Sequence, residues 1–157
     1  MDLKVSRKEV LMLFVFVAAC LLVGVLSGLT APSMDKYADL NTPPLSPPGI
    51  LFPIVWTVLY AFMGIALWMM WRTVNDYRYY VLFGIQLVLN FLWTPIYFAW
   101  GNMYLALVDL ILIWIFVIIM AWLSYMHDVK PATYLMVPYI LWLMFAAYLT
   151  IGTIVLN

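Results

Sequence analysis

Charged residues are scarce in this chain. Only 9% of its 157 residues are Asp, Glu, Lys or Arg, whereas 68% are hydrophobic. Soluble domains carry roughly 25% charged residues, and a soluble protein of this length could not bury so many apolar side chains. The composition therefore excludes a soluble domain and predicts an integral membrane protein that forms a single transmembrane domain over residues 1–157.

Residues that carry chemistry are also scarce. The single cysteine, Cys20, excludes an internal disulfide and a cysteine-based zinc site. The sequence has no phosphate-binding glycine loop, no Ser/His/Asp set and no cluster of metal ligands, and the only histidine, His127, lies in a polar break. We therefore expect no metal site, no required cofactor and no nucleic-acid partner. A series of intramembrane charges, which a pump or ion channel would need, is missing as well.

Long apolar runs dominate instead. A membrane-spanning helix needs about 20 mostly apolar residues, and five segments qualify: 10–29, 50–71, 79–100, 104–125 and 132–155. Most breaks between them are short and contain turn residues such as Gly101 and Asn102. The expected fold class is an all-α integral membrane protein, a five-transmembrane-helix bundle. The first segment resembles a signal peptide, but its apolar run continues to Leu29, which favours a retained helix.

The basic residues predict the orientation in the membrane, because cytoplasmic loops carry an excess of Lys and Arg. Only Lys36 lies on the side of the membrane opposite to the N-terminus. The other six share the side of the N-terminus: Lys4, Arg7, Lys8, Arg72, Arg78 and Lys130. We therefore expect the N-terminus in the cytoplasm, and the C-terminus and the first loop outside a cell membrane.

The one long break, residues 30–49, is rich in proline. Five prolines fall between Pro43 and Pro53, where the apolar helix carrying Trp56 and Tyr60 begins. A connection of about 20 residues in an otherwise tight bundle is usually functional. The pattern predicts a lid above an aromatic binding site.

Polar and aromatic side chains recur inside three spans at similar depth. They are Trp56 and Tyr60 in the second span, Gln86, Asn90, Trp93 and Tyr97 in the third, and Trp142 and Ala146 in the fifth. The spacing in the third span places its four residues on one helix face. Two interpretations stay open: these residues line a ligand pocket, or the amides only bond neighbouring helices while the tryptophans fill the core.

Asp109 is the only ionisable residue well inside a span. Three roles are open for it. It could relay protons or provide a counter-charge for a cationic ligand. Alternatively, it is a structural carboxylate, stabilised by the helix dipole and by hydrogen-bond donors of the loop. We favour the last interpretation, because no Lys, Arg or His shares its depth.

Small residues and prolines inside the spans suggest further packing features. Gly24 and Gly28 form a GxxxG pattern, which suits dimerisation or internal helix packing equally. Pro95 and Pro138 are expected to kink their helices or to free a carbonyl group.

Four motifs in one order resemble the tryptophan-rich sensory protein/translocator protein family, also called peripheral-type benzodiazepine receptors. The first, over residues 47–60, reads Pro-Pro-Gly-x-x-Phe-Pro-x-Val-Trp-Thr-x-Leu-Tyr. The others are Gln-x-x-x-Asn-x-x-Trp-x-Pro-x-x-Phe over 86–98, Ala-Leu-Val-Asp-Leu over 106–110, and Pro-Tyr-x-x-Trp-x-x-Phe-Ala over 138–146. Together they cover about residues 32–157.

The resemblance implies a five-helix bundle, usually a homodimer, that binds porphyrins such as protoporphyrin IX and haem. It also implies binding of isoquinoline-carboxamide or benzodiazepine-type ligands and, in animal members, cholesterol. With the residues singled out above, the candidate ligand-binding set is Tyr37, Pro47, Trp56, Tyr60, Gln86, Asn90, Trp93, Phe98, Trp142 and Ala146. Some members have been proposed to degrade protoporphyrin in light, which would make Trp56 and Trp142 catalytic.

Two positions depart from the family pattern. Leu45 stands where members commonly have tryptophan, so the lid has one aromatic surface fewer. No Lys or Arg follows Tyr148, so the basic residue of the cholesterol consensus is missing. Together with a C-terminus poor in charge, this suggests a bacterial member.

The expected function is that of a membrane receptor or sensor for porphyrins, acting in tetrapyrrole homeostasis or the stress response. Two alternatives stay open: a light-dependent enzyme that degrades porphyrin, and a transporter of porphyrin or other amphiphiles. The expected partners are the lipid bilayer, a hydrophobic small molecule and a second copy of the chain.

Overall fold

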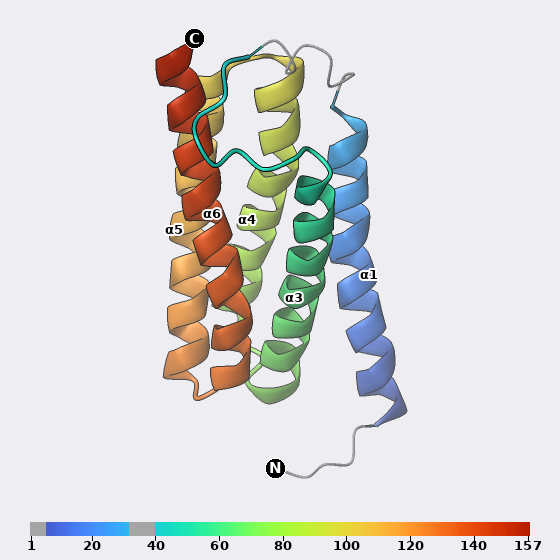
Figure 1. Cartoon of the computed structure of the whole chain (residues 1–157). Helices are drawn as coiled ribbons and strands as arrows, with labels where there is room; N and C mark the ends of the chain where they lie inside the picture. Colours follow the sequence, from blue (N-terminus) through green and yellow to red (C-terminus); the bar gives the residue numbers. More distant parts are fainter. Residues whose placement is uncertain (1–5, 32–39) are drawn as a thin grey trace.

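The computed structural model describes residues 6–31 and 40–157, and within these ranges the secondary structure is entirely helical. The elements are α1 (Arg7–Leu29), α3 (Leu51–Thr73), α4 (Tyr77–Thr94), the π-helix η1 (Pro95–Ala99), α5 (Met103–Met126) and α6 (Lys130–Leu156) (Figure 1). With η1 continuing α4, five helical segments are long and apolar enough to cross a membrane. The prediction of an all-α bundle with five spans is confirmed.

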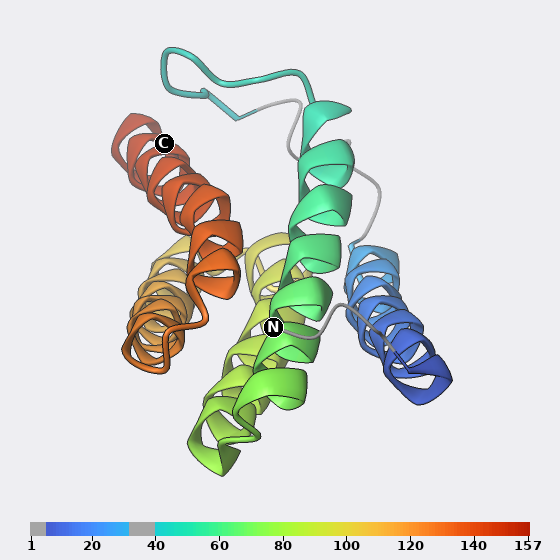
Figure 2. The ribbon, with the colours of Figure 1, turned by 90° about the horizontal axis from the view of Figure 1, so that it is seen from below.

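The helices form a closed ring around a common interior. Helix α1 packs against α3, α3 against α6, α6 against α5, α5 against α4, and α4 against α1. Figures 1 and 2 show that α1 lies at one edge of the bundle beside α3. The ring gives every helix an inward face, and a ligand site inside the bundle has to be built from these faces.

The beginning of α1 is fixed by a capping box and by contacts with the end of α3. The Ser6 hydroxyl accepts from the Glu9 N–H, while the Glu9 carboxylate accepts from the Ser6 N–H. The same carboxylate accepts from Arg72 Nε at 2.8 Å, and Trp68 Nε1 donates to the Glu9 carbonyl. These contacts explain why α1 begins at Arg7, three residues before the predicted start.

Two glycines bring α1 and α3 into close contact. An added Cβ at Gly64 would lie 2.6 Å from Val17 Cα, and one at Gly24 would lie 2.5 Å from the Tyr60 ring. An added Cβ at Gly28 would meet no atom within 4 Å. Of the two glycines in the predicted GxxxG pattern, Gly24 therefore serves internal packing.

Pro95 ends the regular part of α4 and frees a carbonyl, as predicted. Proline has no N–H to donate to the residue four positions earlier, here Phe91. The Ser27 hydroxyl of α1 donates to the Phe91 carbonyl at 3.0 Å, and the Ser27 and Thr94 hydroxyl oxygens are 2.8 Å apart. The broken turn is thus satisfied from a neighbouring helix, which is how membrane helices tolerate proline.

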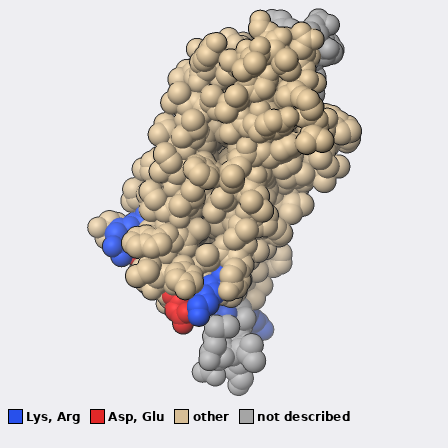
Figure 3. Space-filling model, turned by 60° about the vertical axis from the view of Figure 1, so that its left-hand side comes forward, with Lys and Arg blue, Asp and Glu red and all other residues tan. Residues whose placement is uncertain are grey.

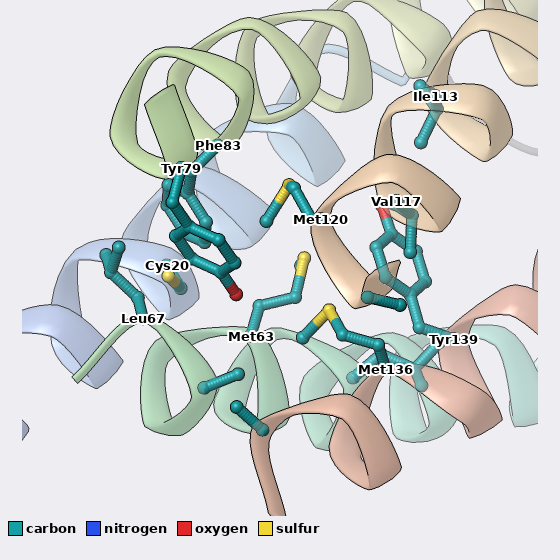
Figure 4. Packing of buried hydrophobic residues seen from close by; sticks show 14 of the residues in the cluster. Cys20, Met63, Leu67, Tyr79, Phe83, Ile113, Val117, Met120, Met136 and Tyr139 are labelled. Carbon is teal, nitrogen blue, oxygen red and sulfur yellow. The ribbon is translucent and has the colours of Figure 1, made fainter. Parts of the chain in front are cut away.

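Methionine side chains fill the interior toward the N-terminal end of the bundle. Met63, Met120 and Met136, from α3, α5 and α6, are each fully buried and point toward one another (Figure 4). Tyr79 and Cys20 complete this region from α4 and α1. Flexible thioethers fill irregular space well, so this half of the interior is a packed core.

The charged side chains visible in Figure 3 gather at the end of the bundle where α1 begins. The described basic residues, Arg7, Lys8, Arg72, Arg78 and Lys130, all belong to this end. Lys4 and Lys36, which complete the predicted charge asymmetry, lie outside the described residues. The orientation in the membrane stays a prediction.

Asp76 links two loops at this charged end. Its carboxylate accepts from the Arg78 N–H at 2.9 Å, from the Arg78 guanidinium at 2.8 Å and from His127 Nε2 at 2.9 Å. The hydrogen bonds from Arg78 hold the pKa of Asp76 well below its usual range. The carboxylate thereby caps α4 and ties the α3–α4 loop to the α5–α6 loop.

Asp76→Asn should lower the thermal midpoint of the purified protein by several degrees at neutral pH. Because folding lowers the pKa, the stabilisation is complete above the ordinary aspartate value and is lost as the pH falls toward the lowered one, between about pH 5 and pH 2. The difference between parent and variant should therefore shrink over this range in melting curves. Asp128→Asn is the control, since that carboxylate is exposed and pairs with exposed Lys130. A constant difference at all pH values would contradict the role of the Asp76 charge.

Candidate functional site

Two groups of aromatic side chains lie where α3 faces α6. The Trp56 ring centroid is 5.8 Å from that of Tyr60 and 6.1 Å from that of Tyr139. The Trp142 ring meets Phe52 edge-on at 5.9 Å and lies 5.6 Å from Phe145 in its own helix. The two tryptophans proposed from sequence as catalytic thus belong to two aromatic groups, each with members on both helices.

A third aromatic group is built by α4 and η1. Trp93 stacks on Tyr97 with centroids 4.9 Å apart and an interplanar angle of 14°, and Phe98 meets both rings edge-on at 6.0 and 5.0 Å. A π-helical turn contains more residues than an α-helical one, so both Tyr97 and Phe98 reach Trp93. The predicted pair Trp93 and Phe98 is therefore brought together by the distortion at Pro95.

A buried polar network joins three helices below these groups. The Tyr60 hydroxyl donates to Asn90 Oδ1 at 2.9 Å, and Asn90 Nδ2 donates to the Tyr139 hydroxyl. Tyr139 donates in turn to Gln86 Oε1 at 3.1 Å, and Gln86 Nε2 donates to the Met63 sulfur at 3.5 Å. Both predicted amides thus bond side chains of α3 and α6, as the second of the two sequence interpretations describes.

The proline-rich segment, residues 40–50, crosses the gap between the C-terminal end of α6 and the start of α3 (Figure 1); we call it the strap. Pro43 is buried against Gly152, where an added Cβ would lie 2.5 Å from the proline Cβ. The Tyr148 hydroxyl donates to the Pro44 carbonyl at 2.7 Å, and Asn157 Nδ2 donates to the carbonyl of Asn41 at 3.0 Å. The strap is therefore attached to the last turns of α6.

The strap contributes few side chains to the interior within its described part. Leu45 exposes 84% of its surface and has a φ of 68°. Pro47 is half-buried just before α3, and Tyr37 lies outside the described residues. The prediction of a lid is therefore supported only by where the strap runs, and not by side chains of its described part.

Two cavities open beside α6. One of about 460 Å³ lies between α3 and α6 and is lined by residues that include Val55, Leu59 and Trp142. The other, of about 840 Å³, lies between α5 and α6 and is bounded by Trp114 and by Pro43 of the strap. Asn90, Trp93 and Phe98 line neither cavity. These two cavities therefore do not include the α4 side of the predicted pocket.

Several buried polar atoms have no hydrogen-bond partner. The indole N–H groups of Trp93 and Trp142 lack acceptors, and Asp109 Oδ2 lacks a donor. The great majority of buried polar groups in proteins are paired, so each exception needs an explanation. The atoms of Trp93, Trp142 and Asp109 lie on α4, α6 and α5 and could recognise a ligand; the Trp114 indole N–H and the Tyr79 hydroxyl are unpaired as well.

The described candidate residues are thus divided among five places. Trp56 and Trp142 lie between α3 and α6, Trp93 and Phe98 lie on α4 and η1, and the network holds Tyr60, Gln86 and Asn90. Ala146 is buried on α6, and Pro47 lies in the strap.

Sequence reasoning left three contacting residues out of the site. Tyr139 and Phe145 lie one turn from Trp142 on the same helix, and this spacing was the available signal. Phe52 follows the strap directly, and nothing in the sequence showed that it meets Trp142. Among the described residues, no three or more His, Cys, Asp or Glu side chains lie close enough together to hold a metal ion.

Comparison with known proteins agrees with the motifs. The sequence model of the TspO/MBR family matches residues 16–156 of this chain. The chain is 37% identical to a tryptophan-rich protein TspO of Chlorobaculum tepidum, over 96% of this chain and 99% of that one. It is 32% identical to a tryptophan-rich sensory protein of Cereibacter sphaeroides, over 90% and 89%, and 36% identical to a translocator protein of Bos taurus, over 72% and 69%.

Proposed function

Because the chain belongs to the TspO/MBR family, we propose that it is a membrane receptor that binds porphyrins, such as protoporphyrin IX and haem, between its helices beneath the strap. Isoquinoline-carboxamide and benzodiazepine-type compounds bind in the same place. The protein acts as a sensor in tetrapyrrole homeostasis or stress, as a homodimer in a bacterial cell membrane, with the strap on the outer side. The name "sensory protein" of a relative is consistent with this role.

The observation that carries the proposal is that the indole N–H groups of two predicted site residues, Trp93 and Trp142, have no acceptor; a third unpaired indole, Trp114, lines the cavity between α5 and α6. Each buried donor without an acceptor costs about 1–3 kcal/mol, and a ligand that supplies an acceptor removes this cost. Porphyrins combine a flat apolar ring with carboxylates, and the drug-like compounds combine aromatic rings with a carbonyl. Both classes match aromatic walls that contain a few donors.

We propose that ligands enter between α3 and α6. Three features support this route: the strap crosses that gap, the cavity of about 460 Å³ reaches Trp142 there, and Pro138 interrupts the hydrogen bonds of α6 beside it. Entry requires Trp56 and Trp142 to move away from the aromatic rings that they contact on the facing helix. The ligand is then enclosed by residues of α3, α4 and α6.

The test is a titration with protoporphyrin IX in detergent, followed by the Soret absorption band in the dark. Trp142→Phe and Trp93→Phe keep an aromatic ring but remove the N–H, so each should weaken binding about five- to tenfold, equivalent to about 1–1.4 kcal/mol.

Trp122→Phe is the matched control, because Trp122 exposes 58% of its surface and lies on the outside of α5. Equal affinities in all three variants would refute the proposed site. Repeating the titration in light tests the alternative of porphyrin degradation, which predicts a new tetrapyrrole product that is lost when Trp56 and Trp142 are both replaced by phenylalanine.

A further inference from the structure

Asp109 is a buried carboxylic acid with one oxygen, Oδ2, that has no hydrogen-bond partner. It exposes only 5% of its surface. The ion pairs within residues 6–31 and 40–157 involve Glu9, Asp76 and Asp128, and Asp109 belongs to none of them. Burial of an uncompensated carboxyl group is among the most costly arrangements in a protein, so this residue needs a reason.

Helix capping does not supply that reason. The N-cap of α5 is Asn102, whose side chain accepts from the Leu105 N–H at 3.0 Å. Asp109 lies nearly two turns farther along, about 9 Å from the start of the helix at 1.5 Å per residue. Capping side chains bond only the N–H groups of the first turn. The interpretation favoured from sequence, a carboxylate stabilised by loop donors, is not supported at Oδ2.

Asp109 lies at the level of two predicted ligand-site residues. Helices α4 and α5 run antiparallel from the turn at Gly101 and Asn102, so residues about equally far from that turn share a level, and this puts Asp109 at about the level of Trp93. The same argument across the α5–α6 turn puts it at about the level of Ala146. In the ring of helices α5 stands between α4 and α6. All three residues therefore belong to one layer of the bundle.

The unpaired atoms are chemically complementary. Trp93 and Trp142 offer N–H donors without acceptors, and Asp109 offers a carboxyl oxygen without a donor. A ligand that satisfies all three has to carry both acceptors and a donor on an aromatic body. We propose that Asp109 accepts a hydrogen bond from a nitrogen-borne proton of the bound ligand, an inference that rests on the proposed ligand site between the helices.

Two sources can provide such a proton. The first is the pair of pyrrole N–H groups of a metal-free porphyrin, which a metal ion replaces. The second is the ammonium group of an aromatic amine, which adds a charge opposite to that of the carboxylate. With either source, the site prefers ligands that carry a proton on nitrogen over ligands of the same shape and hydrophobicity that lack it.

The experiment compares matched ligand pairs in detergent. Protoporphyrin IX and its nickel(II) complex share one body and differ in the pyrrole protons, while 1-naphthylmethylamine and 1-ethylnaphthalene differ in the ammonium group. The parent protein should prefer the proton-bearing member of one pair by about tenfold, and Asp109→Leu should abolish that preference. Preference in the porphyrin pair identifies the pyrrole source, and preference in the amine pair identifies the ammonium source.

Two further variants separate recognition from structure. Asp109→Asn keeps the shape and one acceptor oxygen but no charge, so it should retain most of a pyrrole-based preference and lose an ammonium-based one. Thr150→Val removes another buried polar group, whose hydroxyl donates to the Ala146 carbonyl, and should leave both preferences unchanged.

Unchanged preferences in Asp109→Leu, or equal weakening of both members of a pair, overturn the inference while the proposed porphyrin site stands. Failure of the parent protein to bind any of the four compounds overturns the proposed function and this inference together. If Asp109→Leu does not fold, the Asp109→Asn comparison decides. Loss of the amine preference in that variant supports the ammonium source, and a small reduction of the porphyrin preference supports the pyrrole source. No change in either preference overturns the inference.

Discussion

Replacing Gly64 by alanine should lower the free energy of unfolding by about 2–3 kcal/mol and separate α1 from α3. An added Cβ would lie 2.6 Å from Val17 Cα, 2.9 Å from Val17 N and 3.0 Å from the Phe16 carbonyl oxygen. These are backbone atoms of a continuous helix, so they cannot rotate away as a side chain would, and overpacking of this kind costs about 1–3 kcal/mol, occasionally more. Unfolding by dodecyl sulfate in mixed micelles, followed by circular dichroism, measures the loss.

The matched control is Gly84→Ala in α4. An added Cβ at Gly84 meets no atom within 4 Å, and alanine is favoured over glycine inside a helix by about 1 kcal/mol. This variant should therefore be as stable as the parent or slightly more stable. Equal destabilisation by the two substitutions would mean that the close approach of α1 to α3 does not determine the stability of the bundle.

The helices were predictable from sequence because their signals are local. Apolar runs of spanning length, interrupted by turn residues such as Gly101 and Asn102, are enough to predict five spans. The contact at Gly64 was missed, because a single glycine in an apolar run shows no pattern until the neighbouring helix is placed. Gly24 was noticed through its GxxxG pattern, and only the position of Tyr60 shows that it packs inside the monomer.

The distortion of α4 shows the same limit. Pro95 predicts a freed carbonyl, and this prediction is confirmed. What satisfies the carbonyl is Ser27, which belongs to a helix more than 60 residues earlier in the chain. The π-helical turn that brings Tyr97 and Phe98 to Trp93 also depends on how the break is accommodated. Local sequence indicates where a helix is interrupted, whereas the form of the interruption is decided by tertiary contacts.

For the candidate site, sequence spacing predicted which residues of α4 share a face. It did not predict the partners, because the rotation of one helix relative to another is set by packing around the whole ring. Tyr139 shows this: it lies at the centre of the polar network, yet it appeared in the sequence only as part of a family motif. The lid remains a prediction, since Tyr37 and residues 32–39 lie outside the described part of the chain.

Asn90→Leu should lower the free energy of unfolding by about 2 kcal/mol. The substitution leaves the Tyr60 hydroxyl, buried at 5% exposure, without the acceptor that it has in Asn90 Oδ1. A buried hydroxyl without a partner costs about 1–3 kcal/mol, and Tyr139 loses one of its two bonds as well. Chemical unfolding in micelles measures the change. Tyr60→Phe removes the stranded hydroxyl, so the double variant should recover about 1 kcal/mol relative to the sum of the single changes.

This double-mutant cycle also separates the two interpretations that the sequence left open. If Asn90 serves only the network, the double variant regains stability and binds protoporphyrin IX as the parent does, because an apolar pair replaces a satisfied polar pair. If Asn90 also contacts the ligand, stability recovers while affinity stays low, since leucine cannot replace the amide in a hydrogen bond. Strict additivity of the two stability changes would contradict the hydrogen bond between Tyr60 and Asn90. Stability and affinity, measured on the same four proteins, therefore assign the amide to the core, to the site or to both.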